Sequence, residues 1–199
     1  MLLKILVAVC VLPFFAAVGP VQAKDTVQPL VHVESVQADF VQEKQLPILV
    51  RPILSKGKFV FQAPGSLRWE YFTPIRTVLL MHDGHTRKFI EHNGEFVEEQ
   101  GMGVDAMQIV LQEITGWLDG EITDTATFQA QVKENGLIVL LPREAALANI
   151  ISRIELQLLG DSGLMESVTL HEGPDSLTRM VFSNGLLNGQ VAAIRFTEP

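Results

Sequence analysis

Apolar and polar residues alternate along most of this chain, most regularly between residues 55 and 84. Leu67, Trp69 and Tyr71 are separated by charged residues, and the preceding run repeats the alternation with Phe59 and Phe61. Successive side chains of a strand point to opposite faces, so this pattern predicts strands with one apolar and one polar face. Pro-Gly, Thr-Pro and Asp-Gly pairs separate the runs, which predicts tight turns between consecutive antiparallel strands.

The same reasoning along the whole chain predicts about eleven strands. We expect them over residues 36–44, 53–62, 66–73, 76–82, 86–92, 95–99, 125–133, 137–141, 151–159, 164–171 and 176–183. A sheet of this size seldom stays flat, and it usually curls into a barrel or half-barrel. We therefore expect a mainly β fold of the α+β class, with short helices across the mouth or open side. Composition does not decide whether the interior is filled by side chains or holds a small ligand.

One segment has the periodicity of a helix. Within residues 104–118 apolar side chains recur every three or four positions, and Gly120 ends the pattern. The apolar stripe consists of Met107, Val110, Leu111, Ile114 and Trp117. It could be ordinary core or a lid that faces a ligand, and periodicity does not distinguish the two. Shorter helical segments are expected at residues 26–33 and 142–149.

The first 23 residues have the features of a secretory signal peptide. Lys4 is their only charge, an apolar run covers residues 5–18, and Val21-Gln22-Ala23 forms a small-residue cleavage pattern. The apolar run is too short to span a bilayer. We therefore expect cleavage after residue 23 and export from the cytoplasm, with residues 24–199 as a single domain. The one cysteine, Cys10, lies in the signal segment, so the mature chain has no disulfide, and we do not expect lipidation there.

The charge balance excludes some classes of partner. The full chain has a net charge of −8, and loss of Lys4 with the signal segment makes the mature chain more acidic. Because Lys and Arg are not clustered, the sequence argues against nucleic-acid binding and against standing attraction to anionic lipid surfaces. No linker, repeat or low-complexity tract divides residues 24–199.

The sequence gives little support for a catalytic or metal-binding function. His82, Asp83, His85 and His92 offer potential metal ligands, but an Asp-Gly turn with exposed histidines explains them as well, and we expect no metal site. The chain lacks a Gly-x-Ser-x-Gly motif, a phosphate loop and a dinucleotide fingerprint. Carboxylate pairs such as that at residues 98–99 fall in polar segments unsuited to a glycosidase dyad. We expect neither enzymatic activity nor a cofactor.

Five motifs in order give a resemblance to a known family. They are Val36-Gln-Ala-Asp-Phe-Val-Gln42, Gly57-Lys-Phe-Val-Phe-Gln-Ala-Pro64, Leu67-Arg-Trp69, Pro74 and Asp83-Gly84. Their order and spacing over residues 36–92 resemble the N-terminal half of the periplasmic outer-membrane lipoprotein carriers of the LolA type. The resemblance implies an unclosed antiparallel β-barrel with an α-helical lid around an apolar cavity.

The resemblance also implies a function. Such carriers take acylated lipoproteins from an inner-membrane export complex and hand them to an outer-membrane acceptor, and they do so as monomers without stable insertion into a membrane. The cargo here is then a lipoprotein or a related acylated envelope lipid. An alternative is a sensor or adaptor of the same fold that detects lipoproteins without transporting them. The expected lipid-binding residues are Phe40, Phe59, Phe61, Leu67, Trp69, Tyr71, Leu79, Phe89, Met107, Val110, Leu111, Ile114 and Trp117.

Two positions depart from the family pattern. Carriers of this type often have an arginine that tethers the lid immediately before the first of these prolines, where this chain has Ala63. Arg51 and Arg68 are near it in the sequence and are candidates to replace it. Typical carriers also continue for several residues beyond the point where this sequence ends, at Pro199. Lid control and cargo identity are therefore the properties in which we expect this chain to differ.

Overall fold

The computed structural model describes residues 33–99, 116, 124–160, 164–173 and 175–199. The expected signal segment and almost all of the two helical segments predicted at residues 26–33 and 104–118 lie outside the described residues. Among the described residues, no helix is long and apolar enough to span a bilayer.

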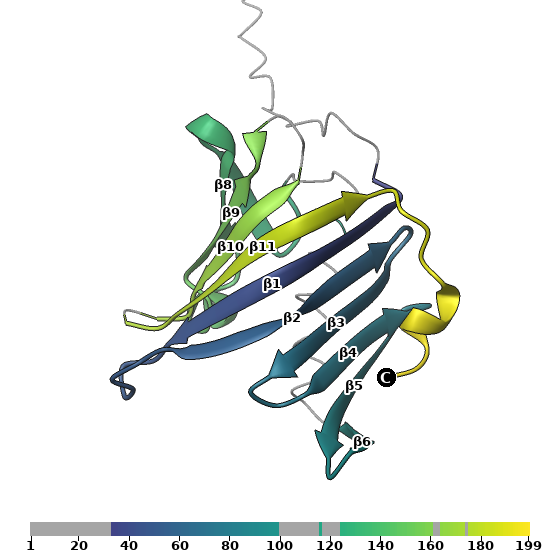
Figure 1. Ribbon diagram of the computed structural model, residues 1–199. Coiled ribbons are helices and arrows are strands. Elements are labelled where there is room, and N and C mark those ends of the chain that lie inside the picture. Colours follow the sequence, from purple (N-terminus) through teal and green to yellow (C-terminus); the bar gives the residue numbers. More distant parts are fainter. Residues whose placement is uncertain (1–32, 100–115, 117–123, 161–163, 174) are drawn as a thin grey trace, which may run out of the picture.

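Within the described residues, eleven strands form one continuous antiparallel sheet (Figure 1). The strands are β1 (Ser35–Gln45), β2 (Ile53–Gln62), β3 (Ser66–Thr73), β4 (Thr77–His82), β5 (His85–His92), β6 (Glu95–Glu99), β7 (Phe128–Val132), β8 (Leu137–Pro142), β9 (Arg153–Leu158), β10 (Met165–His171) and β11 (Leu177–Leu187). Every strand predicted from alternation is present, so the expected mainly β fold is confirmed.

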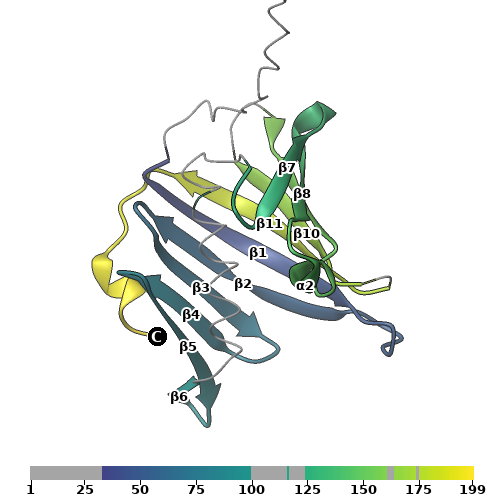
Figure 2. The ribbon, with the colours of Figure 1, turned by 180° about the vertical axis from the view of Figure 1, so that it is seen from behind.

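The strand order is β6-β5-β4-β3-β2-β1-β11-β10-β9-β8-β7. Each half of the sheet is a meander of neighbours in sequence, and the pairing of β1 with β11 joins the halves in the middle. β6 and β7 are the two edges and do not pair with each other, so the sheet is unclosed, as the resemblance implied. Figure 2 shows the curled sheet from behind, with β7, β8 and α2 nearest the viewer.

β11 is longer than the sequence pattern predicts. The expected strand ends at residue 183, where the alternation stops, and the Asn-Gly pair that follows is of a kind that commonly forms turns. In the structure β11 continues to Leu187, which pairs with Val36, and the register shifts between Gln37 and Asp39, where β11 has one residue more than β1. The partner strand is more than a hundred residues away in sequence, so local alternation contains no sign of this extension.

The short helices are peripheral. α2 (Ala145–Ala148) confirms the helical turn predicted at residues 142–149, and a 3-10 turn, η1 (Glu134–Gly136), joins β7 to β8. A second 3-10 helix, η3 (Ala193–Phe196), was not predicted and lies beside β3 and β4 near the C-terminus (Figure 1).

Candidate functional site

One face of the sheet carries a cluster of aromatic rings, and we call this side the apolar face. Phe40 on β1 packs edge-on against Trp69 and Tyr71 on β3, with ring centroids 5.5 and 5.1 Å apart. Phe59 on β2 contacts Trp69 in the same way at 5.3 Å, and Phe182 on β11 contacts both Phe40 and Phe59. The cluster therefore crosses the centre of the sheet, where the two halves of the chain pair.

The aromatic cluster belongs to a larger buried apolar surface that covers both halves of the sheet. Aliphatic and aromatic side chains from β1 to β4 and from β7 to β11 form it. Its buried members are Val36, Phe40, Phe59, Phe61, Leu67, Trp69, Leu79, Met81, Phe128, Ile138, Leu140, Ile151, Ile154, Leu156, Val168 and Met180. These side chains are almost completely buried, so in the structure they form a packed apolar layer that extends over both halves of the sheet.

Three polar groups interrupt the apolar face. The Tyr71 hydroxyl donates a hydrogen bond to Gln42 Oε1 at 2.8 Å. Burial raises the pKa of Tyr71 to about 12, and the nearby Trp69 side chain offsets part of that increase. Trp69 Nε1 is itself buried, and no acceptor among the described residues reaches it within hydrogen-bonding geometry. A buried N–H donor without a partner is uncommon, because it loses its hydrogen bond to water on folding.

Gly57 of β2 leaves space for the Phe40 ring of the neighbouring strand. A Cβ atom at this position would overlap the Glu70 carbonyl oxygen and would lie 2.5 Å from Phe40 Cζ. Only glycine leaves room for the ring and for the close approach of β3. The Gly-x-Phe motif noted in the sequence therefore has a packing role within the aromatic cluster.

Most of the predicted lipid-binding residues of the N-terminal half lie together on the apolar face. Phe40, Phe59, Phe61, Leu67, Trp69 and Leu79 are members of the buried cluster, and Tyr71 packs against it. The remaining predictions, Met107, Val110, Leu111, Ile114 and Trp117, lie outside the described residues.

Phe89 does not lie on the apolar face. It pairs with Val78 across β4 and β5, and with Val78 and Leu80 it forms a second cluster on the opposite face of the sheet. The expectation that it contributes to the same lipid-binding surface is therefore wrong. Phe89 and Ile90 are consecutive apolar residues, so the alternation in β5 does not specify which of them faces inward.

Sequence reasoning missed the contribution of the C-terminal half. Phe182 from β11 completes the aromatic cluster, and Ile154, Leu156 and Met180 extend the buried surface. The alternation within residues 151–159 and 176–183 contained this information, since these side chains occupy every second position.

Arg68 lies on the face opposite the aromatic cluster. Its guanidinium is mostly buried, contacts Glu70 Oε2 at 2.9 Å and donates hydrogen bonds to the carbonyl oxygens of Arg195 and Glu198 at 3.2 and 2.7 Å. This arginine thus fastens the C-terminal segment to β3. Ala63 packs against the apolar cluster, whereas Arg51 lies in the exposed β1–β2 connection.

The histidine motif takes part in the same attachment. His82 Nδ1 is 2.8 Å from Ser66 Oγ, and the His82 ring stacks on Phe196 of η3 at a centroid distance of 6.2 Å. Within the described part of the chain, no group of three or more His, Cys, Asp or Glu residues is arranged to hold a metal ion. The absence of a metal site stays a prediction.

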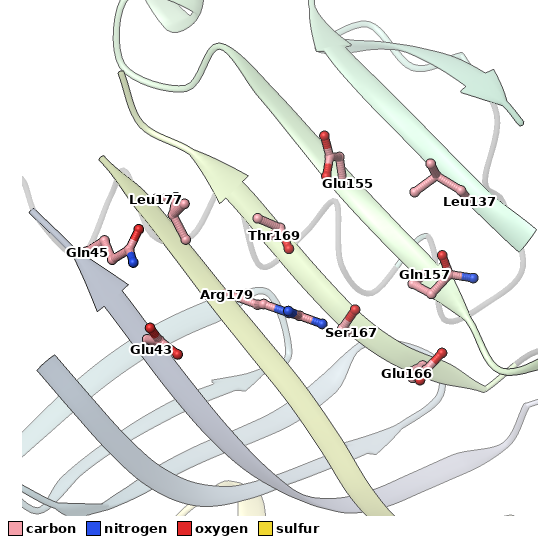
Figure 3. Close-up of a pocket in the computed structure, with 10 residues that line it drawn as sticks. All are labelled: Glu43, Gln45, Leu137, Glu155, Gln157, Glu166, Ser167, Thr169, Leu177 and Arg179. Carbon is pink, nitrogen blue, oxygen red and sulfur yellow. The ribbon is translucent and has the colours of Figure 1, made fainter. Parts of the chain in front are cut away.

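A polar groove of about 580 Å³ lies on the face opposite the aromatic cluster, over β1 and β8–β11 (Figure 3). Arg179 lies between Glu43 on β1 and Thr169 on β10, with which it pairs across the sheet. The lining residues are Glu43, Gln45, Leu137, Glu155, Gln157, Glu166, Ser167, Thr169, Leu177 and Arg179. Three carboxylates, those of Glu43, Glu155 and Glu166, line this groove, which makes it unsuited to hydrocarbon.

Among solved structures, similar folds have low sequence identity. A DUF1329 family protein from Desulfovibrio piger has a TM-score of 0.45 and 11% identity, with 82% of this chain and 90% of that chain covered. A LolA superfamily protein from Nitrosomonas europaea has a TM-score of 0.41 and 10% identity, with 83% and 90% covered. A chain of the Pseudomonas aeruginosa MucA/MucB complex has a TM-score of 0.46 and 15% identity, with 83% of this chain and 56% of that chain covered.

Family membership follows from the sequence. No curated protein matches the chain. The family model described as outer membrane lipoprotein carrier protein LolA matches residues 31–198, nearly all of the segment expected after cleavage. The chain therefore belongs to the LolA family.

Proposed function

We propose that this protein is a periplasmic carrier of acylated cargo. It binds the acyl chains of lipoproteins, or of a related acylated envelope lipid, in an apolar cavity and moves them from the inner to the outer membrane. Membership of the family of outer membrane lipoprotein carrier proteins supports the proposal. The expected signal peptide provides the route of export. In this proposal the protein has no enzymatic activity, because a carrier only binds and releases its cargo.

The observation that carries the proposal is the extent and composition of the apolar face. It presents the rings of Phe40, Phe59, Trp69 and Phe182 next to aliphatic side chains from both halves of the sheet. A packed core alone would account for these residues, but the family context makes hydrocarbon a suitable partner. Each buried CH₂ group of an acyl chain contributes about 0.8 kcal/mol, so a long chain gains on the order of 10 kcal/mol when it leaves water.

The polar groups on the apolar face suit the linkage of an acyl chain. An acyl ester or amide carries a carbonyl oxygen that must keep a hydrogen bond when it leaves water. In the proposed complex, the unpartnered Trp69 Nε1 donates to this oxygen, close to the Tyr71 hydroxyl. This arrangement would place the polar end of the acyl chain at β3 and its hydrocarbon along the apolar face.

Two neighbouring residues of β11 provide the sharpest test. Phe182 is half-buried on the apolar face, whereas Val181 is exposed on the opposite face. We expect Phe182→Asp to weaken binding of a fluorescent fatty-acid probe by roughly tenfold or more, since an anion would replace a large apolar contact. Val181→Asp adds the same charge to the same strand and should leave the affinity unchanged.

Circular dichroism must show that both variants fold, and native mass spectrometry of the wild-type protein, expressed in a periplasm, should show co-purified lipid or acylated peptide. Equal affinities of the two variants for the probe, or no binding by the wild-type protein, would contradict the proposal.

A further inference from the structure

The connection between β1 and β2 exposes aliphatic side chains to solvent. It runs through residues 46–52, with the sequence Leu-Pro-Ile-Leu-Val-Arg-Pro, and projects from the end of the sheet (Figure 1). Ile48 is 88% exposed and Val50 is fully exposed at 102%, and Leu49 between them is also exposed. Three consecutive exposed aliphatic residues at a projecting tip differ from the scattered apolar residues of an ordinary surface.

More apolar side chains lie at the same end of the sheet. Ile53 and Leu54 continue the exposed run into β2. Pairing of Lys56 with Thr73 places the β3–β4 turn, with exposed Phe72 and Ile75, at this end as well. The projecting tip is therefore the most prominent part of an apolar rim.

The charges of the tip differ from those of the molecule. The chain is acidic overall, yet residues 46–52 contain no carboxylate and one guanidinium, that of Arg51. Within the described part of the chain no ion pair to Arg51 occurs, and its side chain is exposed with the rest of the tip. Pro47 and Pro52 bracket the tip and limit the backbone entropy that it would lose when it is held in place.

We propose that this hairpin docks the protein reversibly on a phospholipid bilayer, with Ile48, Leu49 and Val50 between the headgroups and Arg51 at their phosphates. A narrow convex tip matches a lipid surface, which deforms around it, better than it matches a protein groove. The tip also lacks the Trp and Tyr residues typical of protein hot spots. Insertion is driven by burial of the three aliphatic side chains. The guanidinium of Arg51 can reach the headgroup phosphates while the aliphatic part of its side chain lies among apolar groups.

This mode of docking agrees with the acidity of the protein. A net negative chain is repelled by anionic lipid, so the attraction must come from insertion and from the phosphate of a zwitterionic headgroup. The vesicles of the test are therefore made of phosphatidylcholine and phosphatidylethanolamine. The inference goes beyond the proposed function, since it concerns the protein without cargo and can fail while acyl binding in solution stands.

A site-specific label tests the inference directly. Since Cys10 is the only cysteine and lies in the signal segment, the mature chain carrying Val50→Cys can be labelled at one position with an environment-sensitive dye. Leu186→Cys is the matched control, because Leu186 is an exposed aliphatic residue that pairs with Gln37 at the opposite end of the sheet. We expect a blue shift on addition of vesicles at position 50 and none at position 186.

Vesicle sedimentation then measures the strength of docking. We expect the double variant Ile48→Asp and Val50→Asp to partition more than about a hundredfold less than the wild type, since burial of each side chain contributes over a factor of ten and the two factors multiply. Leu186→Asp should partition as the wild type does, and circular dichroism should show all variants folded.

Equal dye shifts at both positions, no shift at either, or unchanged partitioning of the double variant would overturn the inference. A shift that requires protein-containing membranes, and is absent with pure lipid, would assign the tip to a protein partner and would also overturn it.

Discussion

Arg68 offers the clearest stability prediction, because one buried guanidinium joins β3 to the C-terminal segment. The side chains of Arg68 and Glu70 are only 11% and 12% exposed, and the guanidinium reaches the carboxylate through two nitrogens at 2.9 and 3.0 Å. The same guanidinium also donates to two carbonyl oxygens of the C-terminal segment. Replacement of Arg68 by Met keeps the aliphatic stem and removes all of these interactions.

The loss of stability expected for Arg68→Met depends on which partners Glu70 keeps after the substitution. Loss of one member of a buried ion pair costs about 3–5 kcal/mol. Arg76 still contacts Glu70 Oε1 at 3.1 Å, so the carboxylate is not left alone and the lower end of that range applies. We therefore expect Arg68→Met to lower the free energy of unfolding by about 3 kcal/mol, and Tm by roughly 6–12 °C for a chain of this size.

Urea denaturation of the Arg68→Met and Arg76→Met variants compares their free energies of unfolding. The Arg76 side chain is 48% exposed, so Arg76→Met should lower the free energy of unfolding by less than about 1 kcal/mol. Hydrogen exchange should also show faster exchange of the amides of Arg195 and Thr197 in the Arg68 variant only. Equal destabilisation by the two substitutions, or unchanged exchange in the C-terminal segment, would refute the role assigned to Arg68.

Three further predictions concern the two faces of the sheet. Tyr71 is the only tyrosine, so near-ultraviolet absorbance should follow its ionisation with a pKa of about 12. Because the folded pKa lies above the unfolded value of 10.0, stability should fall as the pH rises from 10 to 12, and Tyr71→Phe should remove that part of the decline in urea titrations. Gly57→Ala should destabilise the protein by about 1–3 kcal/mol or more in thermal melts, because the new Cβ displaces Phe40, and a neutral effect would contradict the packing described here. Phe89→Ala should lower stability by about 3–5 kcal/mol, yet the protein that remains folded should bind a fatty-acid probe as the wild type does, since Phe89 lies on the opposite face.

The sequence alone determined the strands and the turns between them. Alternation such as that of Leu67, Trp69 and Tyr71 is a local property, because a strand presents every second side chain to the same face whatever its partner. Turn residues such as Asp83-Gly84 act equally locally, through their tolerance of positive φ, which Asp83 and Gly84 adopt in the structure. All eleven strands, and the apolar side of most of them, could therefore be predicted without tertiary information.

The tertiary structure decided which of these apolar sides form one surface. Pairing of β1 with β11 brings Phe182 to Phe40 and Phe59, and no local pattern specifies a partner so distant in sequence. The register of β4 and β5 assigned Phe89 to the opposite face, because two adjacent apolar residues leave its direction open until the neighbouring strand is in place. The attachment of the C-terminal segment by Arg68 likewise depends on long-range contacts, since a charged residue within an alternating strand otherwise indicates only a solvent-facing position.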